Sequence, residues 1–122
     1  MLNAHQKYRQ NQVETADPAK LLLMLFDGGR RFLRQAEAAL EKKDLEQVNH
    51  YLGRAQGVIA ELMASLDLEQ GEVAANLFRL YEYMHYRLVE ANLKKTKKPL
   101  QEVDAMLATL RDTWKQVSTV RS

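Results

Sequence analysis

The sequence has no cysteine and is poor in proline and glycine, with two prolines and five glycines among its 122 residues. Without cysteine the chain can form no disulfide, no thiolate metal site and no cysteine nucleophile. Its glycines and prolines are too few for the many turns of an all-β chain. No apolar run approaches the roughly 20 residues that cross a bilayer, and the polar start lacks the apolar segment of a secretion signal. We therefore expect a cytoplasmic protein without a membrane-inserted segment.

Neither sign of charge is in excess, because 18 Lys and Arg residues face 16 Asp and Glu residues and leave a net charge of +2. This balance gives no basic footprint of the kind that binds nucleic acid. Hydrophobic residues make up 46% of the chain and charged residues 28%, as in globular domains. The length suits one continuous core, so we expect a single domain over residues 1–122.

Four segments carry apolar residues at the spacing of an amphipathic helix. Asp17 and Pro18 can cap and begin the first, which we expect to run to about Glu41. Asp44 begins the second, with Gln47 as its capping-box partner. The four apolar series are Leu22, Phe26, Gly29, Leu33, Ala36 and Leu40; Val48, Leu52, Ala55, Ile59, Leu62 and Leu66; Val73, Leu77, Leu80, Met84, Leu88 and Ala91; and Leu100, Val103, Leu107, Leu110, Trp114 and Val117. Short connections predict an all-α, antiparallel, up-down four-helix bundle over residues 17–118, preceded by a mobile arm over residues 1–16.

Two of the predicted helices carry more apolar or small residues than one core-facing stripe requires. The helix that begins at Pro18 has a second apolar stripe. The helix that begins after Asp44 has a row of small residues. These sets are Leu21, Leu25, Gly28, Phe32 and Ala39, and Gly53, Gly57, Ala60 and Ala64. Glycine costs about 1 kcal/mol per helix position relative to alanine, so a repeated glycine suggests the close approach of another backbone. The surplus is to be covered by the N-terminal arm or by a partner.

Residues that carry catalytic or metal chemistry are sparse. Glu82 and His85 have the Glu-x-x-His spacing of di-iron bundles, but such a site needs two of these motifs and the chain has one. His50 could serve a phosphotransfer module, although Tyr51 beside it is bulkier than a phosphate site favours. No Ser–His–Asp constellation, HExxH motif or phosphate loop is found. We expect no enzyme, cofactor, metal or small-molecule substrate; a self-associating bundle, either a homodimer or a phosphotransfer module, is the alternative.

Asp27 is a charged residue on a crowded apolar helix, between Phe26 and Gly28. A buried carboxylate must be paired, and Arg87 in the apolar middle of the third helix is a candidate partner. We therefore predict a buried Asp27–Arg87 bridge; the alternative is an exposed pair within the first helix.

Several blocks of the sequence, in order, resemble the FliS family of flagellin-specific export chaperones of flagellar type III secretion. The blocks are Tyr8, Asn11 to Pro18, Leu21 to Gly28, Arg54 to Gln56, Ile59, Glu61-Leu62, Ser65 to Asp67, Gly71 to Ala74, Leu77, Leu80 to Met84, Arg87 to Asn92, and Leu110 to Trp114. The sequence departs from the family pattern at Phe26, where Tyr is usual, and at Gly29, where Ala is usual. The resemblance implies a helical bundle that binds the disorder-prone C-terminal segment of flagellin in the cytoplasm. It also implies that the chaperone prevents premature polymerisation, assists delivery to the export gate, and covers part of its hydrophobic surface with the N-terminal arm when no client is bound.

The residues and the resemblance together predict a groove between the second and third helices, with contributions from the arm and the first helix. Methionines would suit a client that folds on contact. Asp27, Arg87 and Trp114 are expected to be structural. The predicted partner-binding residues are Tyr8, Asn11, Val13, Leu21, Met24, Leu25, Gly53, Gln56, Gly57, Ile59, Ala60, Leu62, Met63, Ala64, Leu66, Tyr81, Met84 and Leu88.

Overall fold

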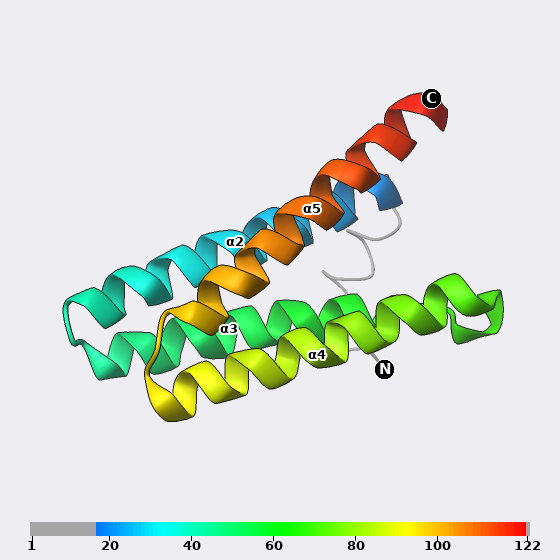
Figure 1. Ribbon diagram of the computed structural model, residues 1–122. Helices are drawn as coiled ribbons and strands as arrows, with labels where there is room; N and C mark the ends of the chain where they lie inside the picture. Colours follow the sequence, from blue (N-terminus) through cyan, green and yellow to red (C-terminus); the bar gives the residue numbers. More distant parts are fainter. Residues whose placement is uncertain (1–16, 122) are drawn as a thin grey trace, which may run out of the picture.

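The computed structural model describes the backbone of residues 17–121 and the side chains of residues 17–116. This part forms helices α2 (Pro18–Glu41), α3 (Leu45–Ala64), α4 (Glu72–Lys94) and α5 (Lys98–Arg121), with a short 3-10 helix η1 (Leu68–Gln70) between α3 and α4. The helices run alternately up and down, so the turns between α2 and α3 and between α4 and α5 lie at one end of the bundle (Figure 1). The predicted all-α four-helix fold is confirmed.

Local signals set the helix starts where the sequence places them. The Asp17 carboxylate accepts a hydrogen bond from the Ala19 backbone N–H at 2.9 Å, and Pro18 opens α2. The Asp44 carboxylate accepts one from the Gln47 backbone N–H at 3.2 Å and caps α3. These carboxylates satisfy backbone donors that have no partner within the helix.

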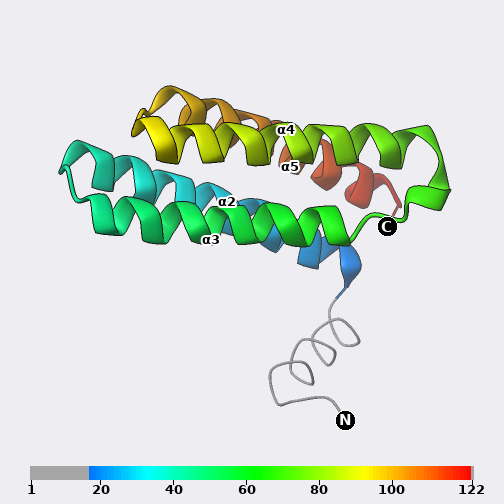
Figure 2. The same cartoon turned by 90° about the horizontal axis from the view of Figure 1, so that it is seen from below.

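The helices form a ring in which α2 packs against α3 and α5, and α4 packs against the same two helices. Figure 2 shows α4 above α3, with α2 and α5 behind them. Gly29 allows the closest approach, because a Cβ at this position would lie 3.1 Å from Leu107 Cδ1 of α5 and 3.3 Å from Val58 Cγ1 of α3. This small residue therefore brings three helices together on one side of the core.

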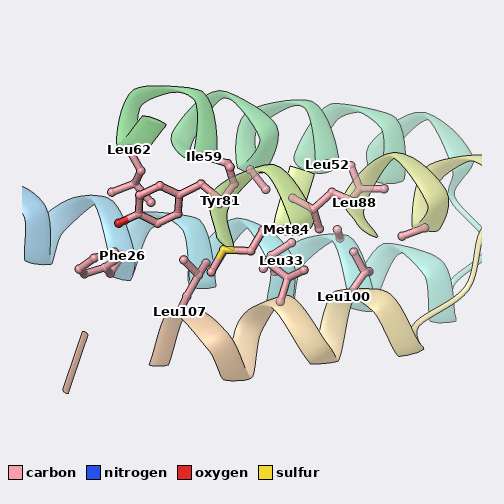
Figure 3. Close-up of a cluster of buried hydrophobic side chains, with 14 of the residues drawn as sticks. Phe26, Leu33, Leu52, Ile59, Leu62, Tyr81, Met84, Leu88, Leu100 and Leu107 are labelled. Carbon is pink, nitrogen blue, oxygen red and sulfur yellow. The ribbon is translucent and has the colours of Figure 1, made fainter. Parts of the chain in front are cut away.

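The core lies between the two helix pairs and consists of hydrophobic residues, with Tyr81 contributing a hydroxyl group. Met84 of α4 points into its middle, toward Leu33 of α2 and Leu107 of α5 (Figure 3). No polar or charged residue of the described chain is buried. The buried hydrophobic residues of the cluster are Phe26, Leu33, Ala36, Ala39, Val48, Leu52, Ala55, Ile59, Leu62, Tyr81, Met84, Leu88, Ala91, Leu100, Val103 and Leu107.

Two details of the predicted apolar series were wrong. Val73 is exposed and Ala74 is buried instead, because the buried stripe of α4 passes through residues 74, 81, 84, 88 and 91. Leu66 lies beyond the end of α3, where it remains half buried against the core. The side chain of Val117 lies outside the described residues.

Candidate functional site

One side of α3 carries small residues and is open. Gly53, Gly57, Ala60 and Ala64 are all exposed. A Cβ added at Gly53 or Gly57 would meet nothing within 4 Å. The glycines therefore do not serve close packing between helices of the described bundle. We call Gly53, Gly57, Ala60 and Ala64 the α3 small-residue face.

One end of the α3 small-residue face lies near the end of α4. At one end, Asn49 of α3 accepts a hydrogen bond from Lys95 Nζ at 2.7 Å, directly after α4. Gly53 and Gly57 follow Asn49 by one and two helical turns, so they continue along the same side. Gln56 and Met63 are half buried, and Met63 packs against the core.

α4 contributes exposed apolar side chains on its outward side. Tyr86 is 63% exposed and Leu93 is 80% exposed, and Val89 lies between them in the sequence. Residues 82, 86, 89 and 93 repeat at intervals of four, three and four, so they share one face of the helix. We call Tyr86, Val89 and Leu93 the α4 outer stripe. Sequence reasoning missed it, although its spacing, offset from the core series, is a readable signal.

α2 provides a second apolar edge on the opposite side of α3. Leu21, Leu25, Gly28 and Phe32 are half buried there, and Met24 is 62% exposed. The Phe32 ring lies under Arg54 of α3, with 5.5 Å between the guanidinium carbon and the ring centroid. We call Leu21, Leu25, Gly28 and Phe32 the α2 strip. Most of the surplus apolar stripe predicted for this helix is thus at the surface of the described bundle, but Ala39, which was assigned to it, is buried in the core.

Several polar ties between helices lie on α5 and in the turn that precedes it. Arg30 Nε of α2 lies 2.9 Å from Asp104 Oδ1, and Lys97 Nζ lies 2.8 Å from Glu41 Oε1. Between α4 and α5, Glu102 accepts hydrogen bonds from Tyr83 and Arg87. The Tyr83 hydroxyl and then the Arg87 guanidinium hold the pKa of the Glu102 carboxyl below its ordinary value. A partner lying along α3 therefore need not break these ion pairs.

A family model described as "Flagellar protein FliS" matches residues 1–121. The flagellar secretion chaperone FliS of Bacillus subtilis (strain 168) is 41% identical over 114 residues, covering 93% of this chain and 85% of the relative. The chain belongs to the FliS family. Flagellar secretion chaperone FliSB of Pseudomonas aeruginosa is 39% identical over 122 aligned positions, covering 96% and 97%. The Salmonella typhimurium (strain LT2) FliS chaperone is 39% identical over 111 residues, covering 89% and 82%. These matches confirm the resemblance read from the sequence blocks.

Five residues assigned to the groove of this FliS-family chain lie in the core instead. Ile59, Leu62, Tyr81, Met84 and Leu88 are all almost completely buried. They cannot contact a partner in this conformation, because they fill the space between the helix pairs. Periodicity alone does not distinguish a core stripe from a groove wall. Burial also raises the pKa of the Tyr81 hydroxyl, so the neutral phenol is favoured.

The remaining candidates divide between the surface and the arm. Met24, Gly53, Gly57, Ala60 and Ala64 are exposed. A second group is half buried: Leu21, Leu25, Gln56, Met63 and Leu66. Tyr8, Asn11 and Val13, with the covering role expected of the arm, lie outside the described residues.

The predicted Asp27–Arg87 bridge was wrong. The Asp27 carboxylate, half exposed, pairs with Arg111 of α5. Arg87 instead lies 3.0 Å from Glu90 Oε2 and 3.1 Å from Glu102 Oε1. Asp27 faces the neighbouring helix α5, whereas α4 lies across the bundle. Trp114, the third residue expected to be structural, donates its indole N–H to the Ala19 carbonyl at 3.2 Å and joins the end of α5 to the start of α2.

The residues considered for catalysis or metal binding do not form a site in the described part of the chain. Glu82, His85 and His50 are exposed, and His50 packs edge-on against the Tyr51 ring at 5.0 Å between centroids. Between residues 17 and 121, no group of three or more His, Asp or Glu side chains is placed to hold a metal. No helix in that range is long and apolar enough to cross a membrane.

Proposed function

We propose that this chain is a cytoplasmic export chaperone that holds the C-terminal segment of flagellin against α3 and the apolar residues beside it. Membership of the FliS family supports the export role, since the relatives matched above are named flagellar secretion chaperones. The single observation that carries the location is the exposed α3 small-residue face. On this view the arm covers apolar surface until a client arrives.

The chemistry of the surface suits an amphipathic client helix. The missing side chains at Gly53 and Gly57 would let a client backbone lie close to α3. Its apolar residues would then contact the α4 outer stripe on one side and the α2 strip on the other. Burial of about 400 Å² of apolar surface would contribute roughly 10 kcal/mol before costs. Ordering a disordered client removes about 2–5 kcal/mol of this, so the complex can form and still release its client.

The proposed consequence for flagellin is a block on polymerisation. A C-terminal segment held along α3 is unavailable to pair with other subunits before export. The complex would then be delivered to the flagellar export gate, where release allows secretion.

A calorimetric titration with a peptide of the flagellin C-terminal segment tests the location. Ala60→Glu places a charged side chain on the α3 small-residue face, and Ala105→Glu makes the same change at an exposed position of α5. We expect Ala60→Glu to weaken binding at least about tenfold, since an unpaired carboxylate would be buried under the client. Ala105→Glu should bind as the wild type does.

Equal affinity of both variants and the wild type would place the client elsewhere. Light scattering over a range of concentrations tests the alternative. A dimer that forms with rising concentration and ignores the peptide would favour a self-associating bundle over the chaperone.

A further inference from the structure

The end of the bundle that holds the α2–α3 and α4–α5 turns is rich in lysine. Six lysines lie at these turns and at the helix ends beside them: Lys42, Lys43, Lys94, Lys95, Lys97 and Lys98. Figure 1 shows both turns side by side at this end. We call it the basic end. The segment from residue 61 to 72, which includes the α3–α4 turn at the opposite end, carries four acidic residues and no lysine or arginine.

Few of these lysines are neutralised by carboxylates. Lys97 pairs with Glu41 at 2.8 Å, and Lys94 pairs with Glu90 at 3.0 Å. Lys95 donates instead to the neutral amide oxygens of Asn49 and Asn92. The side-chain ammonium groups of Lys42 and Lys43 have no hydrogen bond or ion pair to any described residue, although their backbone N–H groups bond to Ala38 and Leu40. The ammonium of Lys98 has a through-space attraction to Glu102. Of the nearby carboxylates, Asp44 is used to cap α3, and Glu46 on the first turn of α3 is a second negative charge.

The backbone at the basic end adds an independent observation. Lys43 and Lys95 have φ angles of 59° and 53°, and they are the two non-glycine residues with positive φ among residues 17–121. This left-handed conformation after a helix is normally given to glycine or asparagine, because a Cβ is strained there. Lysine at both positions makes the fold less stable than glycine would, and it places an ammonium group at each turn. Strained residues of this kind often mark functional sites.

Exposed leucines accompany the lysines. Leu93 is 80% exposed at the end of α4, and Leu45 is 52% exposed at the start of α3. An amphipathic surface with lysines around apolar side chains can rest in the headgroup region of a bilayer. Lysine is a point charge without the planar fork of arginine, which favours diffuse attraction to a charged surface over recognition of one shaped anion.

We propose that the basic end docks on a membrane surface rich in anionic lipid, with the α3–α4 turn pointing away. The lysines gathered at the basic end would orient the molecule as it approaches. The docking surface is distinct from the α3 small-residue face and meets the α4 outer stripe only at Leu93, so the proposal goes beyond client binding and does not depend on it. It would keep the chaperone close to a membrane without inserting any helix.

Sedimentation of the full chain with vesicles of phosphatidylcholine, with and without phosphatidylglycerol, tests the proposal. We expect binding only when phosphatidylglycerol is present, and loss of binding at roughly 0.3 M salt, where the Debye length is only a few Å. Each lysine near an anionic surface contributes roughly fivefold to partitioning. The triple variant Lys42→Gln, Lys43→Gln, Lys98→Gln should therefore bind about a hundredfold more weakly.

A matched control removes the same charge elsewhere. Lys20→Gln, Arg34→Gln, Arg79→Gln changes three exposed basic residues on α2 and α4 away from the basic end. This control should retain most of the binding. Leu45→Ser, at an exposed leucine outside the proposed client surface, should weaken binding several-fold while all the lysines remain.

The variant Lys43→Gly distinguishes a loss of vesicle binding from a loss of folding. Glycine relieves the positive φ at this position, so the thermal midpoint should rise by a few degrees while vesicle binding falls. Calorimetric affinity for the flagellin peptide should not change in any of the variants at the basic end. A loss of vesicle binding with unchanged peptide binding therefore separates this proposal from the proposed function.

Three results would overturn the proposal. One is binding that is indifferent to phosphatidylglycerol, and another is an equal loss in the two triple variants. The third is retention on immobilised polyglutamate without binding to vesicles, which would assign the basic end to an acidic protein.

Discussion

Replacing the two open glycines of α3 should stabilise the protein and weaken its hold on a client. Gly53 and Gly57 are helical, and a Cβ at either position meets no atom within 4 Å. Alanine is better than glycine inside a helix by about 1 kcal/mol, largely because glycine loses more backbone entropy on folding. The double variant Gly53→Ala, Gly57→Ala should therefore gain about 1–2 kcal/mol.

For a domain of this size the gain corresponds to a rise of roughly 4–8 °C in the thermal midpoint. Thermal and urea unfolding followed by far-UV circular dichroism measure it. The flagellin peptide should bind more weakly to the same variant, because two methyl groups then stand where its backbone would lie closest. An unchanged or lower midpoint would refute the reasoning that these glycines serve no purpose within the bundle.

Two other glycines provide the controls. At Gly29 an added methyl would lie 3.1 Å from Leu107 Cδ1 and 3.3 Å from Val58 Cγ1. Crowding of this kind costs about 1–3 kcal/mol, so Gly29→Ala should lower the midpoint. Gly71 has a φ of 93°, which strains any residue with a Cβ, and Gly71→Ala should cost about 1–2 kcal/mol. A uniform gain at all four positions would mean that local geometry is irrelevant.

Three further predictions concern the core and the polar ties. Met84→Ala should lower the free energy of unfolding by about 2–5 kcal/mol in urea denaturation, because this fully buried side chain fills the centre of the bundle. Trp114→Phe should cost about 1 kcal/mol and speed amide hydrogen exchange in the first turn of α2, because it removes the donor to the Ala19 carbonyl. The pKa of Glu102 is held below 4.5 by Tyr83 and Arg87, so its stabilising contribution is complete above pH 4.5 and is lost as the pH falls through the lowered pKa. Glu102→Gln should therefore lower the urea midpoint at neutral pH and have little effect well below that pKa.

Each of these predictions has an outcome that would contradict it. If Met84→Ala lowered the free energy of unfolding only slightly, the core would be able to collapse around the cavity. Uniformly faster exchange in Trp114→Phe, rather than a change confined to the start of α2, would indicate global destabilisation. An effect of Glu102→Gln that is the same at acidic and neutral pH would show that the charge of this carboxylate is not what stabilises the fold.

The sequence predicted the helices well where the signals are local. The bounds of α2 agree with Asp17, Pro18 and Glu41 because a capping carboxylate and a proline act on the next few residues. The apolar series also predicted most of the core, since a helix at the edge of a bundle must bury one stripe. The first turn of α4 was misread because two adjacent apolar residues fit the same spacing.

The site was harder to predict because it depends on how each helix is rotated against its neighbours. The pairing of Asp27 with Arg111, rather than with Arg87, follows from the ring order of the helices, which no single helix encodes. For the same reason Ile59 and its core neighbours were assigned to a groove. The small residues were singled out correctly as unusual, because glycine in a helix has a cost that needs a reason. The basic end becomes evident only when the two turns are seen side by side.

The distribution of polar ties around α5 has a further consequence. The interior has no hydrogen bond or charge to fix how far one helix slides along another. That alignment is left to directional pairs at the periphery, and several of them involve α5, such as Arg30 with Asp104 and Tyr83 with Glu102. α5 thus helps to fix how far α2 and α4 slide along it. A mutation that breaks the polar pairs of α5 would therefore change the relative positions of α2 and α4, and with them surfaces to which α5 itself contributes no residue.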